Sequence, residues 1–409
     1  MSNNSINVYI YEDYLYKNLL PIINNRPTFE IRCGVYTCLD RLKLILPNAN
    51  ISLIVRNELA EITKEIYPNY LVNPDEMADG YWLLGNVLWS KGQIEKITKS
   101  DSIIFLSNNR MVAANLTKED SKEWIRNGGP IYNQDFDLGV GQEINIDIID
   151  YLWDAIRLSP KQIIKDSKFF NLGSIKDLKT IYKGIKTDNI FIDESVDIGY
   201  YTVVDASKGP VIIEKGSRVN PYCYLTGPLY IGPNCTIQSN TILRSGTVVG
   251  PNSVIGGEIS QSIIQSNSNK AHFGYLGNSY LGSWINLGAG TTNSNLKNNY
   301  SNVSILINGK KVDSKQMKLG CFIGDYTRTA INTKINTGTI IGTGSNIVFD
   351  GTLPKSIDSF SWYVGHNKMK YDLKKFLQTL EIVKNRRGYS LSNAERNLLK
   401  YIYENDTVK

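Results

Sequence analysis

One aliphatic residue recurs at every sixth position in the middle of this chain. The uninterrupted series is Ile213, Val219, Leu225, Ile231, Ile237, Leu243, Val249 and Ile255. A helix repeats about every 3.6 residues and a half-buried strand every two, so neither predicts this spacing. A parallel β-helix of hexapeptide turns does, because each short strand sends one aliphatic side chain into a narrow core. We therefore predict a parallel β-helix.

The same spacing continues on both sides of this series, with a shift of phase around residues 260 to 285. Its further members are Ile192, Ile198, Val204, Ile264, Leu276, Leu281, Leu287, Ile323, Ile335, Ile341 and Ile347. Glycine follows many of these residues and suits the tight corners of such a fold. The repeats are expected over residues 189–352. Alternation at 303–307 followed by Asn308-Gly309 predicts a hairpin that projects from the wall, within an excursion at residues 297–318.

The flanking regions follow other patterns. Residues 1–142 alternate short apolar runs with helical spacing, which predicts an α/β domain with a mostly parallel sheet. Residues 143–188 are expected to form a helical connector, whose first helix leads through Ser159-Pro160 into a charged stretch. Residues 353–409 predict a C-terminal helical tail, with a capping box from Ser392 to Glu395.

Bulk properties narrow the class of protein. At 409 residues the chain is too long for one compact core. No apolar stretch is long enough to cross a membrane, and the net charge of +6 is spread along the chain, so we expect neither a membrane nor a nucleic-acid partner. Five scattered cysteines show no metal-ligand spacing. They predict reduced thiols, a cytoplasmic protein and no metal site.

Short motifs carry a resemblance to a known family. In the first domain they are Leu19–Pro21, Asn25–Pro27 and Glu30–Gly34. In the β-helix they are Ser268–His272, Tyr275–Gly277, Asn286–Gly290, Ser294–Tyr300, Ala330–Thr333, Ile335–Gly338 and Ser359–Trp362. With them, the chain resembles the bifunctional UDP-N-acetylglucosamine pyrophosphorylase/glucosamine-1-phosphate N-acetyltransferase family. Within it, the chain is similar to Bacteroidetes-type fusions of a sugar nucleotidyltransferase and an acyltransferase.

This resemblance implies a nucleotidyltransferase-like first domain and a left-handed β-helix. It also implies acetyl-CoA or another acyl-CoA as donor, a homotrimer, and a place in the synthesis of nucleotide sugars for cell-envelope polysaccharide. His272 matches the family's catalytic histidine. Imidazole suits a general base because its ordinary pKa of about 6.5 lets it accept a proton near neutral pH. The other histidine, His366, has no partner motif and is interpreted as structural.

Five further positions match acceptor-binding residues of the family. Tyr275, Asn286 and Asn295 match sugar contacts, and Glu258 matches an acidic position near the acceptor amine. Arg244 matches an arginine that binds the acceptor's phosphate, a role that suits its bidentate guanidinium group.

The chain also departs from the family pattern. Ser260 and Gln261 stand where better-known members carry lysines, a departure that bears on recognition of a sugar 1-phosphate. No glycine precedes Gly34, although a glycine-rich loop normally cradles the triphosphate after the first strand. Asn86 stands where an aspartate normally holds Mg²⁺.

Two arginines of the first domain, Arg26 and Arg32, are candidate phosphate contacts. The leading hypothesis is a CoA-dependent acyltransferase, an N-acetyltransferase, that acts on a phosphorylated or nucleotide-linked amino sugar and has a degenerate nucleotidyltransferase-like domain. The first alternative is an active sugar-1-phosphate nucleotidylyltransferase, which would need Mg²⁺. The second is a non-catalytic β-helix that only oligomerises, although a rod has no use for the His272 motif.

Overall fold

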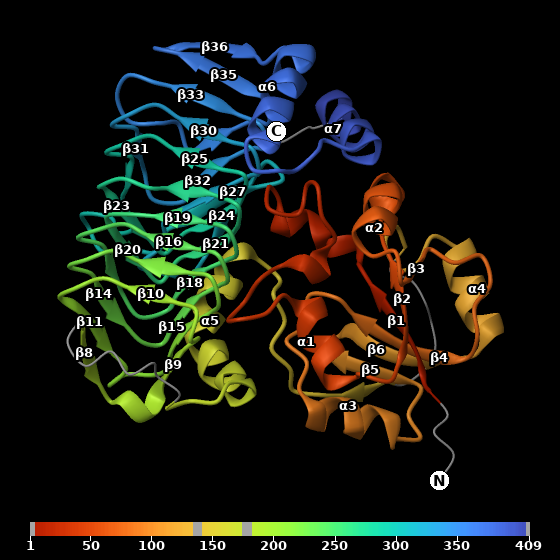
Figure 1. The fold of residues 1–409 in the computed structure, drawn as a ribbon. Helices are drawn as coiled ribbons and strands as arrows, with labels where there is room; N and C mark the ends of the chain where they lie inside the picture. The colour runs from red at the N-terminus through yellow and green to blue at the C-terminus, as the bar shows by residue number, and fades with distance from the viewer. Residues whose placement is uncertain (1–4, 134–140, 174–181, 406–409) are drawn as a thin grey trace.

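The computed structural model describes residues 5–133, 141–173 and 182–405. Figure 1 shows a long β-helix beside an α/β domain, with the helix α5 (Leu152–Asp166) between them and two C-terminal helices at one end of the junction. No helix within the described ranges has the length and apolar character needed to cross a membrane.

The N-terminal domain is built on one seven-stranded sheet in the order β3-β2-β1-β4-β6-β5-β7. Its strands are β1 (Asn7–Tyr11), β2 (Asn50–Ile54), β3 (Leu71–Val72), β4 (Gly80–Leu84), β5 (Ile104–Ser107), β6 (Arg110–Leu116) and β7 (Gln142–Glu143). Strands β1 to β4 are parallel to one another, whereas β6 runs antiparallel to β4 and β5. The helices are α1 (Cys38–Ile45), α2 (Ala60–Ile66), α3 (Lys91–Thr98) and α4 (Lys118–Arg126). The predicted α/β domain with a mostly parallel sheet is confirmed.

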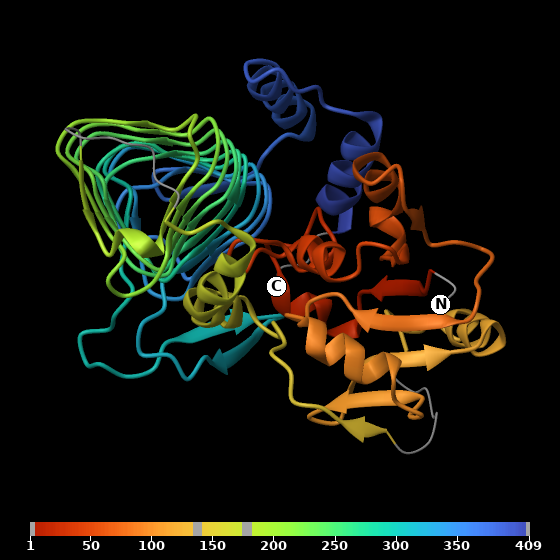
Figure 2. The same ribbon diagram turned by 60° about the horizontal axis from the view of Figure 1, so that its bottom comes forward.

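The β-helix has three walls of parallel strands, and Figure 2 shows its triangular outline. Wall 1 is β9 (Ile190–Ile192), β12 (Val211–Ile213), β15 (Leu229–Ile231), β18 (Thr247–Val249), β21 (Ile263–Ser266), β24 (Tyr280–Ser283), β29 (Cys321–Ile323), β32 (Thr339–Ile341) and β34 (Ser356–Ile357). Wall 2 is β10 (Asp197–Ile198), β13 (Arg218–Val219), β16 (Thr236–Ile237), β19 (Val254–Ile255), β22 (Asn269–Lys270), β25 (Asn286–Leu287), β30 (Arg328–Thr329), β33 (Asn346–Val348), β35 (Ser361–Val364) and the antiparallel β36 (Asn367–Lys370). Wall 3 is β8 (Tyr182–Ile185), β11 (Thr202–Asp205), β14 (Tyr224–Thr226), β17 (Ile242–Leu243), β20 (Glu258–Ser260) and β23 (Tyr275–Gly277), followed by the pair β26 (Thr292–Asn293) and β31 (Lys334–Ile335).

Successive members of the hexapeptide series fall on successive walls. Ile213 lies on a strand of wall 1, Val219 on one of wall 2 and Leu225 on one of wall 3, and all three are buried in one core. The β-helix that the spacing predicts is therefore confirmed, and with it the fold class.

One excursion leaves the walls between β26 and β29. Strands β27 (Ser304–Ile307) and β28 (Lys310–Asp313) pair antiparallel, with Ile307 opposite Lys310. Asn308 and Gly309 between them have φ angles of 49° and 74°. Two successive positive φ angles are what a two-residue hairpin turn requires, and asparagine followed by glycine adopts them most easily.

Helix α5 continues past the point where the sequence pattern indicated its end. Pro160 lies inside the helix, and its ring nitrogen cannot donate to the carbonyl of Ile156 four residues earlier. The amide of Gln261, at a corner of the β-helix, lies 3.5 Å from that carbonyl oxygen. A partner from the β-helix thus compensates for the bond that proline removes, which a local pattern could not reveal.

Wall 1 is apolar on both faces, unlike the other two walls. Along most of its strands one residue points into the β-helix core and its neighbour packs into the apolar cluster that contains the core of the N-terminal domain. The outward members are Ile212, Tyr230, Val248, Ile263, Tyr280, Phe322 and Ile340. They are covered by α5 and by residues 14–33, the docking segment, which follows β1 and contains the 3-10 helices η1 (Tyr14–Leu19) and η2 (Thr28–Glu30).

A buried ion pair lies inside this contact. The guanidinium group of Arg26 binds the carboxylate of Asp325 and lies 3.3 Å from the hydroxyl of Ser283. Asp325 also accepts hydrogen bonds from the amide of Asn25 at 3.0 Å and from the backbone N–H of Ser283 at 2.9 Å. Both members of the pair are buried, so neither can exchange its partner for water.

Arg26→Met should destabilise the protein, because it leaves the Asp325 carboxylate buried without its counter-charge. Breaking a buried pair on one side costs about 3–5 kcal/mol. Arg218→Met is the matched control, since the pair of Arg218 with Asp197 is exposed on both sides and contributes about 1 kcal/mol or less. Urea unfolding followed by fluorescence measures both. Equal midpoints for the two variants would show that the buried pair does not hold the domains together.

Candidate functional site

The edge between walls 2 and 3 carries His272. Strand β22 ends at Lys270, the chain turns, and β23 begins at Tyr275. The His272 side chain is exposed, and the structure records no hydrogen bond from its imidazole to any residue in the described ranges. The glycines of the coil below make room for this turn, since a Cβ on Gly256 would lie 2.4 Å from the carbonyl oxygen of Ala271. The edge therefore presents an imidazole to solvent on a closely packed backbone.

A buried lysine fixes the same turn from inside the β-helix. Lys270 lies beside Ile255 in the register of wall 2, at the core position of the hexapeptide series. Its ammonium group donates to the carbonyl oxygen of Gly256 at 2.9 Å and to that of His272 at 2.5 Å. Burial lowers the pKa of Lys270 to about 8. In the sequence, the only sign of this residue is that an aliphatic side chain is absent where the series needs one.

Four of the five predicted acceptor residues lie together along wall 3, whose strand β23 begins three residues after His272. Arg244 binds Glu258, with Nε 2.5 Å from the carboxylate oxygen Oε1. Glu258 is directly opposite Tyr275 in the strand register. The amide of Asn295 donates to the Tyr275 hydroxyl at 3.0 Å. Burial raises the pKa of Tyr275, and the negative charge of Glu258 raises it further. We call this set the polar row.

Asn286, the fifth predicted residue, lies on wall 2 on the other side of the edge. Its side-chain oxygen accepts a hydrogen bond from the amide of Asn269 at 3.3 Å. The strand that carries Asn286 is the neighbour of β22, which leads to His272. The predicted residues thus flank the edge from both walls.

Arg26 and Arg32 are engaged by the contact between the domains. Arg26 binds Asp325, as described above. The backbone N–H of Arg32 donates to the Tyr280 hydroxyl at 2.9 Å, and its guanidinium group binds the carbonyl of Val35 and lies over the ring of Tyr230. Both side chains are buried in this arrangement, so neither guanidinium group is open to a phosphate.

Internal carboxylates occupy the carboxyl end of β1, where a phosphate loop would lie. The fully buried Glu12 accepts hydrogen bonds from the backbone N–H groups of Thr28 at 2.9 Å and Arg56 at 3.0 Å. It also pairs with the Arg56 side chain. Asp13, the next residue, binds Arg110. Backbone N–H groups that could hold a phosphate oxygen are therefore already bound to a carboxylate.

Asn86 lies in the interior of the domain. Its amide donates to the carbonyl oxygen of Ile149 at 2.8 Å, and its side chain is buried. Among the described residues no cluster of three His, Cys, Asp or Glu side chains could hold a metal ion. These surroundings do not fit a bound Mg²⁺.

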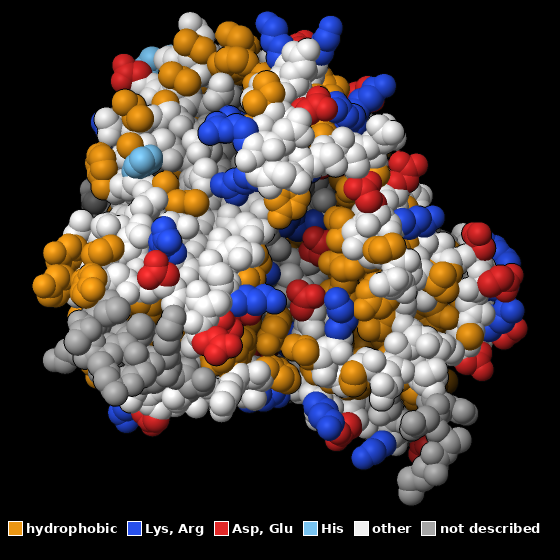
Figure 3. Space-filling view, viewed as in Figure 1, with side chains coloured by type: hydrophobic (Ala, Val, Ile, Leu, Met, Phe, Trp, Pro, Cys, Tyr) orange, Lys and Arg blue, Asp and Glu red, His pale blue; other side chains and the backbone are white. Residues whose placement is uncertain are grey.

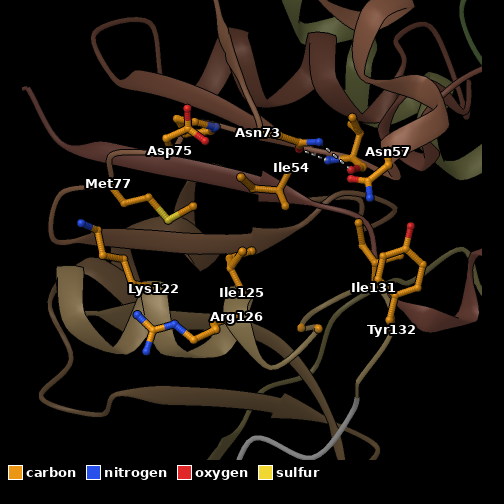
Figure 4. A pocket seen from close by; sticks show the side chains of 14 residues that line it. Ile54, Asn57, Asn73, Asp75, Met77, Lys122, Ile125, Arg126, Ile131 and Tyr132 are labelled. Atoms are coloured by element: carbon orange, nitrogen blue, oxygen red, sulfur yellow. Dashed lines mark hydrogen bonds between the residues drawn. The ribbon is translucent and has the colours of Figure 1, made fainter.

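A cavity of about 560 Å³ lies elsewhere in the N-terminal domain, and Figure 4 shows its lining. Ile54 is at the carboxyl end of β2, and Asn73 follows β3. The side-chain oxygen of Asn73 accepts a hydrogen bond from the backbone N–H of Val55, and its amide donates to the carbonyl oxygen of the same residue. Lys122 and Arg126 approach from α4. Open α/β sheets bind ligands beyond the carboxyl ends of their parallel strands, so this cavity is a candidate site. The sequence does not indicate this cavity, because its walls come from three separate segments.

Comparisons with known proteins agree with this architecture. Residues 8–175 match the family model described as sugar nucleotidyl transferase. A bifunctional sugar-1-phosphate nucleotidylyltransferase/acetyltransferase of Sulfurisphaera tokodaii is 37% identical over 34% of this chain and 35% of its own length. The bifunctional protein GlmU of Methanococcus vannielii is 34% identical over 49% of this chain and 50% of its own length. That of Methanococcus aeolicus is 28% identical over 84% and 93%.

The chain resembles the bifunctional GlmU proteins. This resemblance, predicted from the sequence motifs, is confirmed, and the predicted enzyme class agrees with the names of these relatives. The chain covers half or less of the first two relatives, so their activities enter only as proposals.

Two solved structures share a more distant likeness. The polySia specific acetyltransferase NeuO aligns over 47% of this chain and 85% of its own, with 15% identity and a TM-score of 0.27. The Francisella novicida UDP-N-acetylglucosamine acyltransferase aligns over 53% and 77%, with 16% identity and a TM-score of 0.21. Similarities this weak indicate nothing about the function of this chain.

The buried lysine predicts a pH-dependent stability. Because the folded-state pKa of about 8 lies below the ordinary value of 10.5, the unfolded chain binds more protons between these pH values. The contribution of Lys270 to stability therefore rises as pH rises through this window. The unfolding free energy of the wild type relative to Lys270→Met should increase by on the order of 2 kcal/mol between about pH 7 and pH 10. Urea unfolding measures this difference between the wild type and the variant. A difference that does not change with pH would contradict a lowered pKa of Lys270 in the folded protein.

Proposed function

We propose that the chain is a CoA-dependent acyltransferase, an N-acetyltransferase, that acts on a phosphorylated or nucleotide-linked amino sugar. The observation that carries this proposal is the exposed imidazole of His272 beside the polar row. An unpaired imidazole near neutral pH can accept a proton, and the adjacent row supplies a cation, a carboxylate and hydrogen-bonding groups for a sugar. The names of the relatives support the same chemistry.

The residues of this edge would act as follows. His272 takes the proton from the acceptor amine as its nitrogen attacks the thioester carbonyl carbon. A C–N bond forms, the C–S bond breaks, and His272 returns the proton to the departing thiolate. Arg244 would bind an acceptor phosphate, and Glu258 would attract the amine toward the edge. Lys270 holds the His272 carbonyl and so keeps the turn in one conformation.

The same edge offers a surface for a second copy of the chain. Tyr201, Phe273 and Ile331 lie on the turn between walls 2 and 3 in three different coils and are 71%, 68% and 70% exposed. Figure 3 shows hydrophobic side chains gathered along the outer edge of the β-helix. Exposed apolar patches of this kind mark interaction sites, which supports a homotrimer with its donor sites between neighbouring β-helices. The buried free cysteines support a cytoplasmic location.

His272→Ala should lower kcat for acetyl-CoA-dependent acylation by about 10²–10⁴-fold, because the amine loses its proton acceptor. The assay follows CoA release with a panel of amino-sugar phosphates and nucleotide amino sugars. His366→Ala is the matched control, since that imidazole packs against the ring of Phe349 several coils farther along the β-helix. An unchanged rate for the His272 variant would remove the imidazole from the mechanism.

A second candidate function is nucleotidyl transfer from NTP to a sugar 1-phosphate. The cavity beyond β2 and β3 and the match of residues 8–175 favour it. The carboxylate of Glu12 opposes it, because it binds the N–H groups that would otherwise face the phosphates. We propose that this domain binds or positions a substrate without transferring a nucleotide.

Pyrophosphate release from NTP, Mg²⁺ and a sugar 1-phosphate should therefore stay at background. The panel includes all common NTPs, so that an unexpected base is not missed. Release above background that Asn73→Ala abolishes would overturn the proposal and place nucleotidyl transfer in the cavity. Arg244→Gln is the matched control, because that residue lies on the β-helix and should not affect this reaction.

A further inference from the structure

A second cavity, of about 440 Å³, lies between wall 2 of the β-helix and the C-terminal end of α6 (Leu373–Asn385). The residues that matter for its chemistry are Asn269, Trp284, Asn286, Arg328, Arg386 and Arg387. We call it the basic pocket. Figure 3 shows Lys and Arg side chains along the line where the β-helix meets α6. The fold thus brings arginines from two distant parts of the chain to one cavity.

The charge of the basic pocket is not balanced by carboxylates. No Asp or Glu lines the cavity, and none of the ion pairs formed by the described residues includes Arg328, Arg386 or Arg387. Lys384, the nearest further cation on α6, differs because it pairs with the carboxylate of Glu395. Three unpaired guanidinium groups in one hollow repel one another, and an anion would remove that repulsion.

One of the arginines is held in place before any ligand arrives, and a second is half-buried. Arg387 donates to the side-chain oxygen of Asn269 at 2.7 Å and to the carbonyl oxygen of Asn252 at 3.0 Å, and it lies over the ring of Trp284. Strand β30 fixes only the backbone of Arg328, and its half-buried side chain has no hydrogen-bond partner among the described residues. Burial lowers the pKa of both Arg328 and Arg387, which shows that water solvates their charges poorly.

The basic pocket is close to the proposed reaction centre. Asn269 begins β22, and His272 is only three residues farther along the chain, so their Cα atoms are about 10 Å apart or less. Asn286 lines the same cavity from the next strand. A group bound here would therefore lie within one substrate length of the imidazole.

We propose that the basic pocket binds the phosphate or diphosphate group of a ligand, with Arg328 and Arg386 as its main contacts and Arg387 as a fixed third cation. Guanidinium groups suit this task because their planar donors match phosphate oxygens bidentately. The link to acyl transfer rests on the proposed function, whereas the site itself does not. The diphosphate could belong to a nucleotide sugar or to CoA, which share this chemistry.

Calorimetric titration of the full chain with inorganic pyrophosphate at low ionic strength tests the site. Arg328→Gln should weaken binding about 10-fold or more, since it removes a charge-assisted bidentate contact. Arg218→Gln, an exposed arginine of the same wall that is paired with Asp197, is the matched control and should change affinity less than twofold. Arg386→Gln, exposed at the end of α6, repeats the test if Arg328→Gln does not fold. Equal affinities for all variants, or no binding by the wild type, would overturn the proposal.

Competition then identifies the source of the diphosphate. UDP that displaces pyrophosphate indicates a nucleotide sugar, and CoA that does so indicates the acyl donor. Displacement by neither would mean that no phosphate-bearing substrate uses the pocket, and the proposal would fail.

Different results would contradict the proposed phosphate site and the proposed acyltransferase function. His272→Ala should bind pyrophosphate as the wild type does. Binding at the basic pocket without any acylation would contradict the proposed function alone, and acylation without pyrophosphate binding would contradict this inference alone.

Discussion

The structure depends on the need to cover wall 1 of the β-helix. A strand that carries apolar residues on both faces cannot leave one of them in water, because every exposed aliphatic or aromatic side chain costs free energy. Helix α5 and the docking segment cover the outward face of this wall. The ion pair between Arg26 and Asp325 then fixes the docking segment against the β-helix, because separating the pair would leave a buried charge without its counter-charge. The two domains consequently form one packed body rather than two units on a linker.

This coverage has a consequence for the chemistry of the N-terminal domain. The docking segment is the stretch that follows β1, where a nucleotidyltransferase would keep its phosphate loop open. Here it lies against the β-helix, and Glu12 satisfies the N–H groups of Thr28 and Arg56 that face the end of the strand. Reactive groups that remain open to solvent lie on the far side of the β-helix, at the edge that carries His272. These contacts support the proposal that the first domain binds or positions a substrate without transferring a nucleotide.

Sequence periodicity predicts the parts of the structure that repeat. The hexapeptide series gives the β-helix because each aliphatic side chain fills the same position in every coil, and the hairpin turn at Asn308-Gly309 follows from local backbone preferences. The double apolar pairs of wall 1, such as Ile212-Ile213 and Tyr230-Ile231, contain a further clue: one face must be covered by another domain. Read alone, however, they do not say what covers it.

Contacts between distant segments explain what the sequence could not predict. Arg26 resembles a phosphate ligand in the sequence, and only the fold shows that Asp325, far along the chain, binds it. Pro160 suggests a helix end until Gln261 is placed beside the carbonyl that it leaves free. Lys270 breaks the aliphatic series, yet its bonds to two carbonyl oxygens appear only when the turn closes around it. The basic pocket likewise joins Arg328 to the end of α6.

A crystal structure of the full chain soaked with CoA and a nucleotide amino sugar most directly tests whether the chemistry lies at the β-helix edge. The thiol of CoA and the sugar amine should lie beside the His272 imidazole, with the sugar against Tyr275 and Asn295 and the docking segment still on wall 1. Density for both ligands in the N-terminal cavity alone, with the edge empty, would contradict this assignment.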